Sequence, residues 1–66
     1  MEVRVNGRIR EFSEELSVEK LIHLEESPTE GLVVMVNDEI IAREVWDTRV
    51  ISSEDEVELL CFVSGG

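Results

Sequence analysis

Residues 56–66 read Glu-Val-Glu-Leu-Leu-Cys-Phe-Val-Ser-Gly-Gly, an apolar segment that runs directly into two glycines. The apolar part of this segment predicts a last strand over residues 56–63. Glycine supplies no side chain to a core and loses more conformational freedom on folding than any other residue. We therefore expect residues 63–66 to form a flexible tail, which reaches roughly 13 Å when fully extended. The preceding residues are then expected to form a domain that presents Gly66.

The length of 66 residues predicts a single small domain, which buries only ~60% of its unfolded surface. Such a chain has little room for a large active-site cleft. The 16 acidic and 6 basic residues give a formal net charge of -10. This charge repels phosphate backbones and anionic lipids, so we expect no nucleic-acid partner, no membrane partner and an attraction to basic protein surfaces.

The compartment is expected to be the cytoplasm. Cys61 is the single cysteine of the chain, so no internal disulfide forms, as is typical of a reducing compartment. The first residues, Met1-Glu2-Val3-Arg4, contain no apolar signal core. The longest apolar run, over residues 32–36, is far too short to cross a bilayer.

The rest of the chain predicts two hairpins on either side of one helix. Asn6-Gly7 is the strongest short hairpin signal available, and Asn37-Asp38 is a second plausible tight turn. Residues 42–49 have no clear pattern, and residues 52–55 read as a polar turn. The expected strands cover residues 2–6, 8–12, 32–36, 39–41, 50–51 and 56–63.

The expected helix begins after Ser17, whose hydroxyl can accept a hydrogen bond from a free N–H of the first turn. It should end near Glu26, because Pro28 disfavours helical geometry at the residue before it. Helical spacing then predicts one apolar stripe. Its members are Val18, Leu21, Ile22 and Leu24.

This order of elements predicts an α+β fold with a mixed β-sheet and one α-helix packed on one face. A last strand that closes against the first must lie inside the sheet. The ubiquitin-like β-grasp has this order of elements. We expect residues 1–66 to form a single domain of this type.

Two stretches resemble one family of β-grasp proteins. They are Val36-Asn37-Asp38-Glu39-Ile40-Ile41-Ala42-Arg43-Glu44-Val45-Trp46 and the final Gly65-Gly66. Both are similar to the ThiS-type (ThiS/MoaD-like) sulfur carriers of thiamine biosynthesis, and the likeness covers nearly the whole chain in length and element order. The sequence departs from the family at residues 53–55, Ser-Glu-Asp, where the family often has a glycine-containing turn.

The resemblance implies a carrier and not an enzyme, which agrees with the lack of a recognisable catalytic constellation. It implies that a ThiF/MoeB-like adenylating enzyme uses ATP to activate the carboxylate of Gly66. A sulfur donor of the desulfurase type would then leave a thiocarboxylate, and thiazole synthase would take the sulfur. Ser64 and Gly65 would complete the tail. We expect no cofactor or metal on the chain itself. Because it lacks a phosphate-binding glycine loop, ATP must be bound by the partner.

Alternation along the last strand predicts which residues face a partner. Val57, Leu59 and Cys61 are expected on the core face, where Cys61 acts as a small buried hydrophobe and not as a persulfide carrier. The opposite face would then carry an uncovered apolar strip, which commonly marks an interface. A register error of one residue would exchange the two faces. The strip consists of Val33, Met35, Leu60 and Phe62.

The remaining candidate residues are interpreted as structural. His23 is expected to face solvent, Trp46 to seal one end of the core, and Arg43 to bond carbonyls or a carboxylate. The acidic turn at residues 54–56 is expected to be solvated and not a cation site. Three alternatives stay open for the chain: the small subunit of molybdopterin synthase, a ubiquitin-like modifier that forms isopeptide bonds through Gly66, and a plain interaction module.

Overall fold

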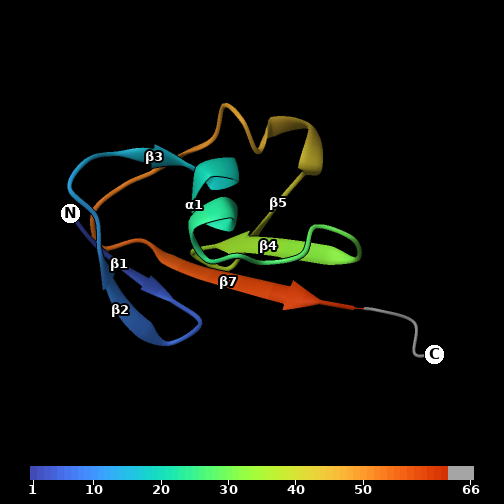
Figure 1. The fold of residues 1–66 in the computed structure, drawn as a ribbon, viewed down its shortest axis with the longest axis horizontal. Helices are drawn as coiled ribbons and strands as arrows, with labels where there is room; N and C mark the ends of the chain where they lie inside the picture. Colours follow the sequence, from blue (N-terminus) through green and yellow to red (C-terminus); the bar gives the residue numbers. More distant parts are fainter. Residues whose placement is uncertain (63–66) are drawn as a thin grey trace.

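The computed structural model describes residues 1–62, so the predicted tail at residues 63–66 lies outside the described part. A five-stranded sheet has the order β2-β1-β7-β4-β5, and the helix α1 crosses one of its faces (Figure 1). The predicted α+β architecture, a mixed sheet with one helix on one face, is confirmed. The strands of this sheet are β1 (Glu2–Val5), β2 (Arg8–Glu11), β4 (Leu32–Val36), β5 (Glu39–Ile41) and β7 (Glu56–Cys61).

Three smaller elements complete the layer that carries the helix. The helix α1 covers Val18–Leu24, and it follows β3 (Leu16–Ser17), which pairs with β6 (Val50–Ile51) in a second, two-stranded sheet. A 3-10 turn, η1 (Arg43–Val45), lies in the segment that had no clear sequence pattern. None of the helices within residues 1–62 is long and apolar enough to cross a membrane.

The last strand, β7, lies at the centre of the five-stranded sheet. It pairs in parallel with β1, where Val5 lies opposite Val57, and antiparallel with β4, where Val36 lies opposite the same residue. The two hairpins, β1–β2 and β4–β5, are therefore joined through β7. The predicted position of the last strand inside the sheet is confirmed.

The core lies between the helix and the inner face of the sheet. Inward positions of β1 and β4 are buried while their neighbours are more exposed, which is the alternation expected for a sheet covered on one side. In β7 only Val57 is buried, and burial decreases along the strand through Leu59 to Cys61. The buried apolar residues are Val3, Val5, Val18, Leu21, Ile22, Leu32, Val34, Val36, Ile41, Trp46, Ile51 and Val57.

The helix begins and packs largely as predicted, with one error at its end. The Ser17 hydroxyl accepts a hydrogen bond from the Lys20 N–H at 3.1 Å, which confirms the cap. Leu24 is 48% exposed, so its assignment to the apolar stripe is wrong. At 3.6 residues per turn it lies about 110° from the centre of the buried stripe. Glu25 lies nearer that centre, and its carboxylate is 2.7 Å from the Arg10 guanidinium.

The turns explain why the two hairpins form. Asn6 and Gly7 have φ values of 50° and 81°, and Asn37 and Asp38 have values of 52° and 69°. Two-residue hairpin turns of the commonest type require positive φ at both positions, so both turn predictions are confirmed. Glu54 has φ of 71°, a left-handed conformation at the place where the sequence lacks the expected glycine.

Candidate functional site: the end of the central strand

The end of β7 is the place where the described chain leads into the two glycines. The Phe62 N–H donates a hydrogen bond of 2.8 Å to the Gly31 carbonyl, one residue beyond the last residue of β7. The chain is therefore still attached to the β4 side of the sheet at Phe62. Figure 1 shows this end of β7 projecting past the helix, on the opposite side of the molecule from the N-terminus.

The predicted apolar strip lies on the outer face of the sheet, away from the helix. Val33 lies opposite Leu60 in the β4–β7 register, while Val34 and Val36 are buried on the inner face. The alternative register, with the faces exchanged, is therefore excluded. Leu60 is 37% exposed.

The exposure of the strip is uneven. Val33 and Met35 are half-buried, so they form the floor of the strip and are less uncovered than predicted. Phe62 is 67% exposed and is the most prominent of the four predicted residues. Directly opposite Met35 lies Ile40 of β5, which is 68% exposed and was missed. The two-residue turn at Asn37-Asp38 fixes this pairing, so the position of Ile40 could have been predicted from the sequence.

Cys61 corrects one prediction. Alternation placed it on the core face correctly, because it lies opposite the buried Leu32. It is nevertheless exposed, and its Sγ is 3.8 Å from the Pro28 carbonyl. The helix ends at Leu24, so this end of the sheet extends past the element that covers the inner face. The residue is on the predicted face but is not a buried hydrophobe.

Two asparagines from the hairpin turns hold β7 along its length. The Asn37 Oδ1 accepts a hydrogen bond from the Glu56 N–H at 2.9 Å, at the beginning of β7. On the other edge of β7, the Asn6 Oδ1 accepts one from the Leu59 N–H at 2.8 Å. Both side chains act as extra ladder partners, so β7 is tied on both edges almost to its end.

The acidic turn before β7 is partly structural. The Asp55 Oδ2 accepts a hydrogen bond from the Ser52 N–H at 2.8 Å, and its Oδ1 accepts one from the Asn37 Nδ2 at 3.0 Å. These bonds hold the turn closed. Across residues 1–62 no group of three acidic, histidine or cysteine side chains has the arrangement of a metal site.

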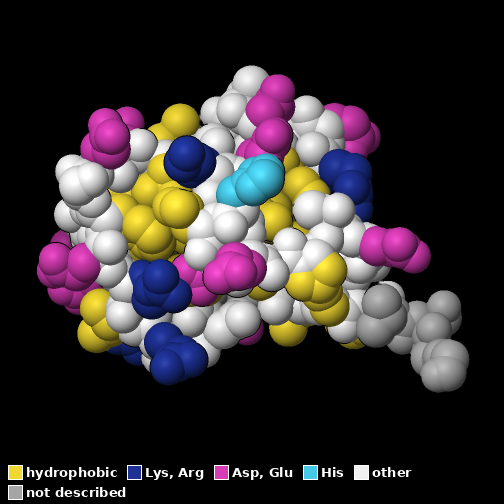
Figure 2. All heavy atoms as spheres, viewed as in Figure 1, with side chains coloured by type: hydrophobic (Ala, Val, Ile, Leu, Met, Phe, Trp, Pro, Cys, Tyr) yellow, Lys and Arg dark blue, Asp and Glu magenta, His cyan; other side chains and the backbone are white. Residues whose placement is uncertain are grey.

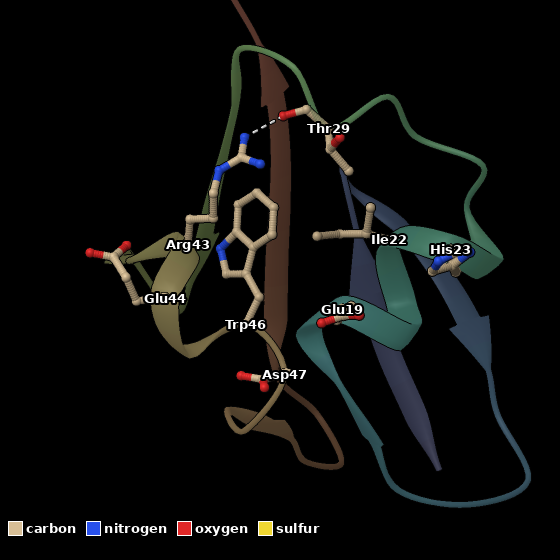
Figure 3. A pocket seen from close by; sticks show the side chains of 8 residues that line it. All are labelled: Glu19, Ile22, His23, Thr29, Arg43, Glu44, Trp46 and Asp47. Carbon is tan, nitrogen blue, oxygen red and sulfur yellow. Dashed lines mark hydrogen bonds between the residues drawn. The ribbon is translucent and has the colours of Figure 1, made fainter.

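Trp46 and Arg43 are structural, as predicted. Trp46 is buried and its indole N–H donates to the Ile41 carbonyl at 3.0 Å. The Arg43 guanidinium lies 4.7 Å from the centre of the Trp46 ring and donates a hydrogen bond of 2.6 Å to the Thr29 carbonyl (Figure 3). The motif that suggested the family therefore ties η1 to the loop before β4.

A hollow of about 390 Å³ lies beside these two side chains, on the helix side of the molecule. Charged groups surround it, and the guanidinium of Arg43 that faces it is already bonded to Thr29 (Figure 3). His23, at its margin, is exposed as predicted. The lining residues are Glu19, Ile22, His23, Thr29, Arg43, Glu44, Trp46 and Asp47.

A mixed sheet, a single helix across one face and a last strand at the centre define a β-grasp protein. Within that class, the model of the ThiS family matches residues 3–66. The matched range includes the Asn37 to Trp46 run and both terminal glycines. The chain belongs to the ThiS family.

Two solved structures from Geobacter metallireducens are similar to the chain over its whole length. The crystal structure of a thiamine biosynthesis protein (ThiS) is 33% identical, with a TM-score of 0.86 and full coverage of both chains. An NMR solution structure of a thiamine biosynthesis protein is 32% identical, with a TM-score of 0.82, and the match covers 100% of this chain and 88% of that one.

One curated relative comes from Porphyra purpurea and is described as "Uncharacterized protein ycf40". It is 25% identical over 64 residues, which are 97% of this chain and 90% of the relative. The likeness therefore extends over nearly the full length of both proteins.

Proposed function

We propose that the chain is a sulfur carrier for the thiazole synthesis step of thiamine formation, with the carboxylate of Gly66 as the group that carries the sulfur. The observation that carries this proposal is the family match, which extends through Gly65 and Gly66. The fold supports it, because the strand that precedes these glycines is paired along both of its edges at the centre of the sheet. Both similar solved structures are of a thiamine biosynthesis protein, which favours this pathway over molybdopterin synthesis.

The proposed chemistry is carried out by partner enzymes. A carboxylate oxygen of Gly66 attacks the α-phosphate of ATP on the adenylating enzyme, which gives an acyl-adenylate and releases pyrophosphate. The terminal sulfur of a donor persulfide then attacks the carbonyl carbon and displaces AMP. A thiol that forms a disulfide with the donor sulfur finally releases the thiocarboxylate. Glycine suits the sulfur attack because no Cβ crowds the carbonyl carbon. Thiazole synthase consumes the resulting thiocarboxylate, and the chain itself catalyses none of these steps.

The described residues supply binding and orientation. The outer-face strip of Val33, Met35, Leu60 and Phe62, widened by Ile40, is proposed to bind the adenylating enzyme. An exposed apolar patch next to the reactive segment brings the partner to the correct end of the molecule.

The net charge acts over a longer range. Figure 2 shows acidic side chains spread over the visible face and not gathered into one cluster. A dispersed charge of this sign speeds encounter with a basic partner surface and adds little to the affinity at close contact.

Intact-mass spectrometry tests the proposal. The chain is purified from its own cells, and separately incubated with the adenylating enzyme, ATP and a sulfur donor. We expect replacement of one oxygen by sulfur at the C-terminus, and no such product from a variant that lacks Gly66. Conjugation to lysines of other proteins would instead support a modifier, and an unchanged mass under both conditions would support an interaction module.

Reconstitution with each candidate synthase then assigns the pathway. The thiocarboxylate form is expected to support thiazole formation by thiazole synthase. Sulfur transfer only to a molybdopterin precursor would refute the thiamine assignment while leaving the carrier role intact.

A further inference from the structure

The loop before β4 touches the chain at the point where the described structure ends. Gly31 has φ of 69°, and its carbonyl accepts the hydrogen bond from the Phe62 N–H at 2.8 Å. Gly31 also leaves no room for a side chain. A Cβ on Gly31 would overlap the carbonyl oxygen of Phe62 and lie 3.1 Å from its carbonyl carbon. Only glycine fits this position without moving the backbone of Phe62.

The same loop is held from its other side by the family motif. Arg43 donates a hydrogen bond of 2.6 Å to the Thr29 carbonyl, and the buried Trp46 ring lies under the guanidinium (Figure 3). The Thr29 carbonyl also accepts a bond of 3.3 Å from the Leu32 N–H, at the first residue of β4. The loop is therefore fixed between the core and the end of β7.

We infer that residues 28–31 are the seat that fixes where the last four residues leave the domain, and that Gly31 is a positioning residue for delivery of the Gly66 carboxylate. This inference rests on the proposed sulfur-carrier function. It adds a role for a glycine remote in sequence from the reactive end, which acts through the backbone of Phe62.

The short span explains why the seat matters. Residues 63–66 reach roughly 13 Å at most, so a shift of their starting point passes directly to the carboxylate. Misplacement by about 1 Å can lower a reaction rate about 100-fold. A methyl group at position 31 has to displace the Phe62 carbonyl by such an amount, because it overlaps that oxygen. The loss is expected in turnover more than in encounter, because the outer-face strip remains.

Gly7 provides a matched control for Gly31. Gly7 also has a positive φ, 81°, but a Cβ there would meet no atom within 4 Å. Gly31→Ala and Gly7→Ala therefore share the backbone strain of a left-handed alanine and differ in the collision. We expect Gly31→Ala to lower kcat for adenylation, measured by ATP–pyrophosphate exchange, by about tenfold or more, while KM changes less than about threefold. Gly7→Ala is expected to react like the unaltered chain.

Amide exchange and chemical rescue separate positioning from general damage. Exchange at the Phe62 N–H should accelerate in Gly31→Ala and remain slow in Gly7→Ala. A chain of 66 residues is accessible to chemical synthesis, so D-alanine can be placed at position 31. D-residues favour positive φ, and the methyl group then replaces the other Cα hydrogen of Gly31, so it leaves the position that overlaps the Phe62 carbonyl. Turnover should return to within about threefold of the unaltered chain.

A second pair of variants keeps the test decisive if Gly31→Ala fails to fold. Arg43→Gln releases the loop without adding atoms and is expected to lower kcat by about threefold or more. Its control is Arg49→Gln, which also removes an arginine bond to a backbone carbonyl, that of Val50 at 2.6 Å. Equal kcat for the members of both pairs would overturn the inference, as would a slow D-alanine chain. A lack of turnover by the unaltered chain would overturn the proposed function itself.

Discussion

Phe62 offers the sharpest test of the outer-face strip, because its side chain is 67% exposed beside the end of β7. Only about a third of its surface is buried within the chain, so truncation to alanine removes little intramolecular burial. Complete burial of a phenylalanine stabilises by about 1.5–3 kcal/mol, so Phe62→Ala should lower the free energy of unfolding by about 0.5–1 kcal/mol. If the adenylating enzyme covers the remaining surface, roughly 100–150 Å² more becomes buried, which corresponds to about 3 kcal/mol.

The expected loss of affinity is smaller than this area suggests, because ordering of the side chain offsets part of it. A loss of about 2 kcal/mol, the level typical of an interface hot spot, weakens Kd about 30-fold. Titration calorimetry with the purified adenylating enzyme measures Kd, and urea unfolding measures the stability of the same preparations. The prediction is therefore a large change in Kd with a small change in stability.

Ile9 is the matched control for Phe62. It is 57% exposed and lies on β2 opposite Arg4, which also pairs with Glu56 at the far end of β7. Phe62 lies six residue steps after Glu56 along an extended chain, or roughly 20 Å away. Ile9→Ala should leave Kd unchanged within about twofold. If Phe62→Ala loses clear thermal stability while Kd stays the same, or if both variants weaken binding equally, the strip is not the binding surface.

Three further predictions concern stability, each measured by urea unfolding. Glu54→Gly should stabilise the fold by about 0.5–1 kcal/mol, because it relieves a left-handed residue at φ of 71°; Glu54→Gln, which keeps the Cβ, should not, and equal effects would assign the gain to charge. Ser17→Ala should cost about 1 kcal/mol by removing the cap on the Lys20 N–H, whereas an unchanged midpoint would mean that solvent replaces the cap fully. Trp46→Phe should cost about 1–2 kcal/mol, because the buried Ile41 carbonyl loses its indole donor; a neutral result would contradict the role assigned to this bond.

Local chemistry made most of the fold predictable from the sequence. The turns at Asn6-Gly7 and Asn37-Asp38 set the ends of two hairpins and the pairing within each, because few residue pairs accept positive φ so readily. Strict alternation in β4 fixed which face of that strand is buried. The two-residue strand β3 escaped prediction because its pairing with β6 depends on residues far away in the chain.

The error at Cys61 arises because a face can be predicted from the sequence but its cover cannot. Cys61 lies on the inner face as alternation requires, yet it is exposed because the helix stops short of it. Leu24 lies in the helix, yet outside the arc that meets the sheet. The role of Gly31 could not be predicted from the local sequence, since its bond to Phe62 depends on the β4–β7 register.

The central place of β7 has a consequence for how the protein is made. The chain adds its middle strand last, and the hairpins on either side share no ladder until that strand inserts between them. A product that stops before residue 56 holds two separate hairpins and a helix with no common sheet, so it is open to proteolysis. Synthesis thus has a built-in check: a copy that reaches the folded state has been translated up to the residues that precede its two final glycines.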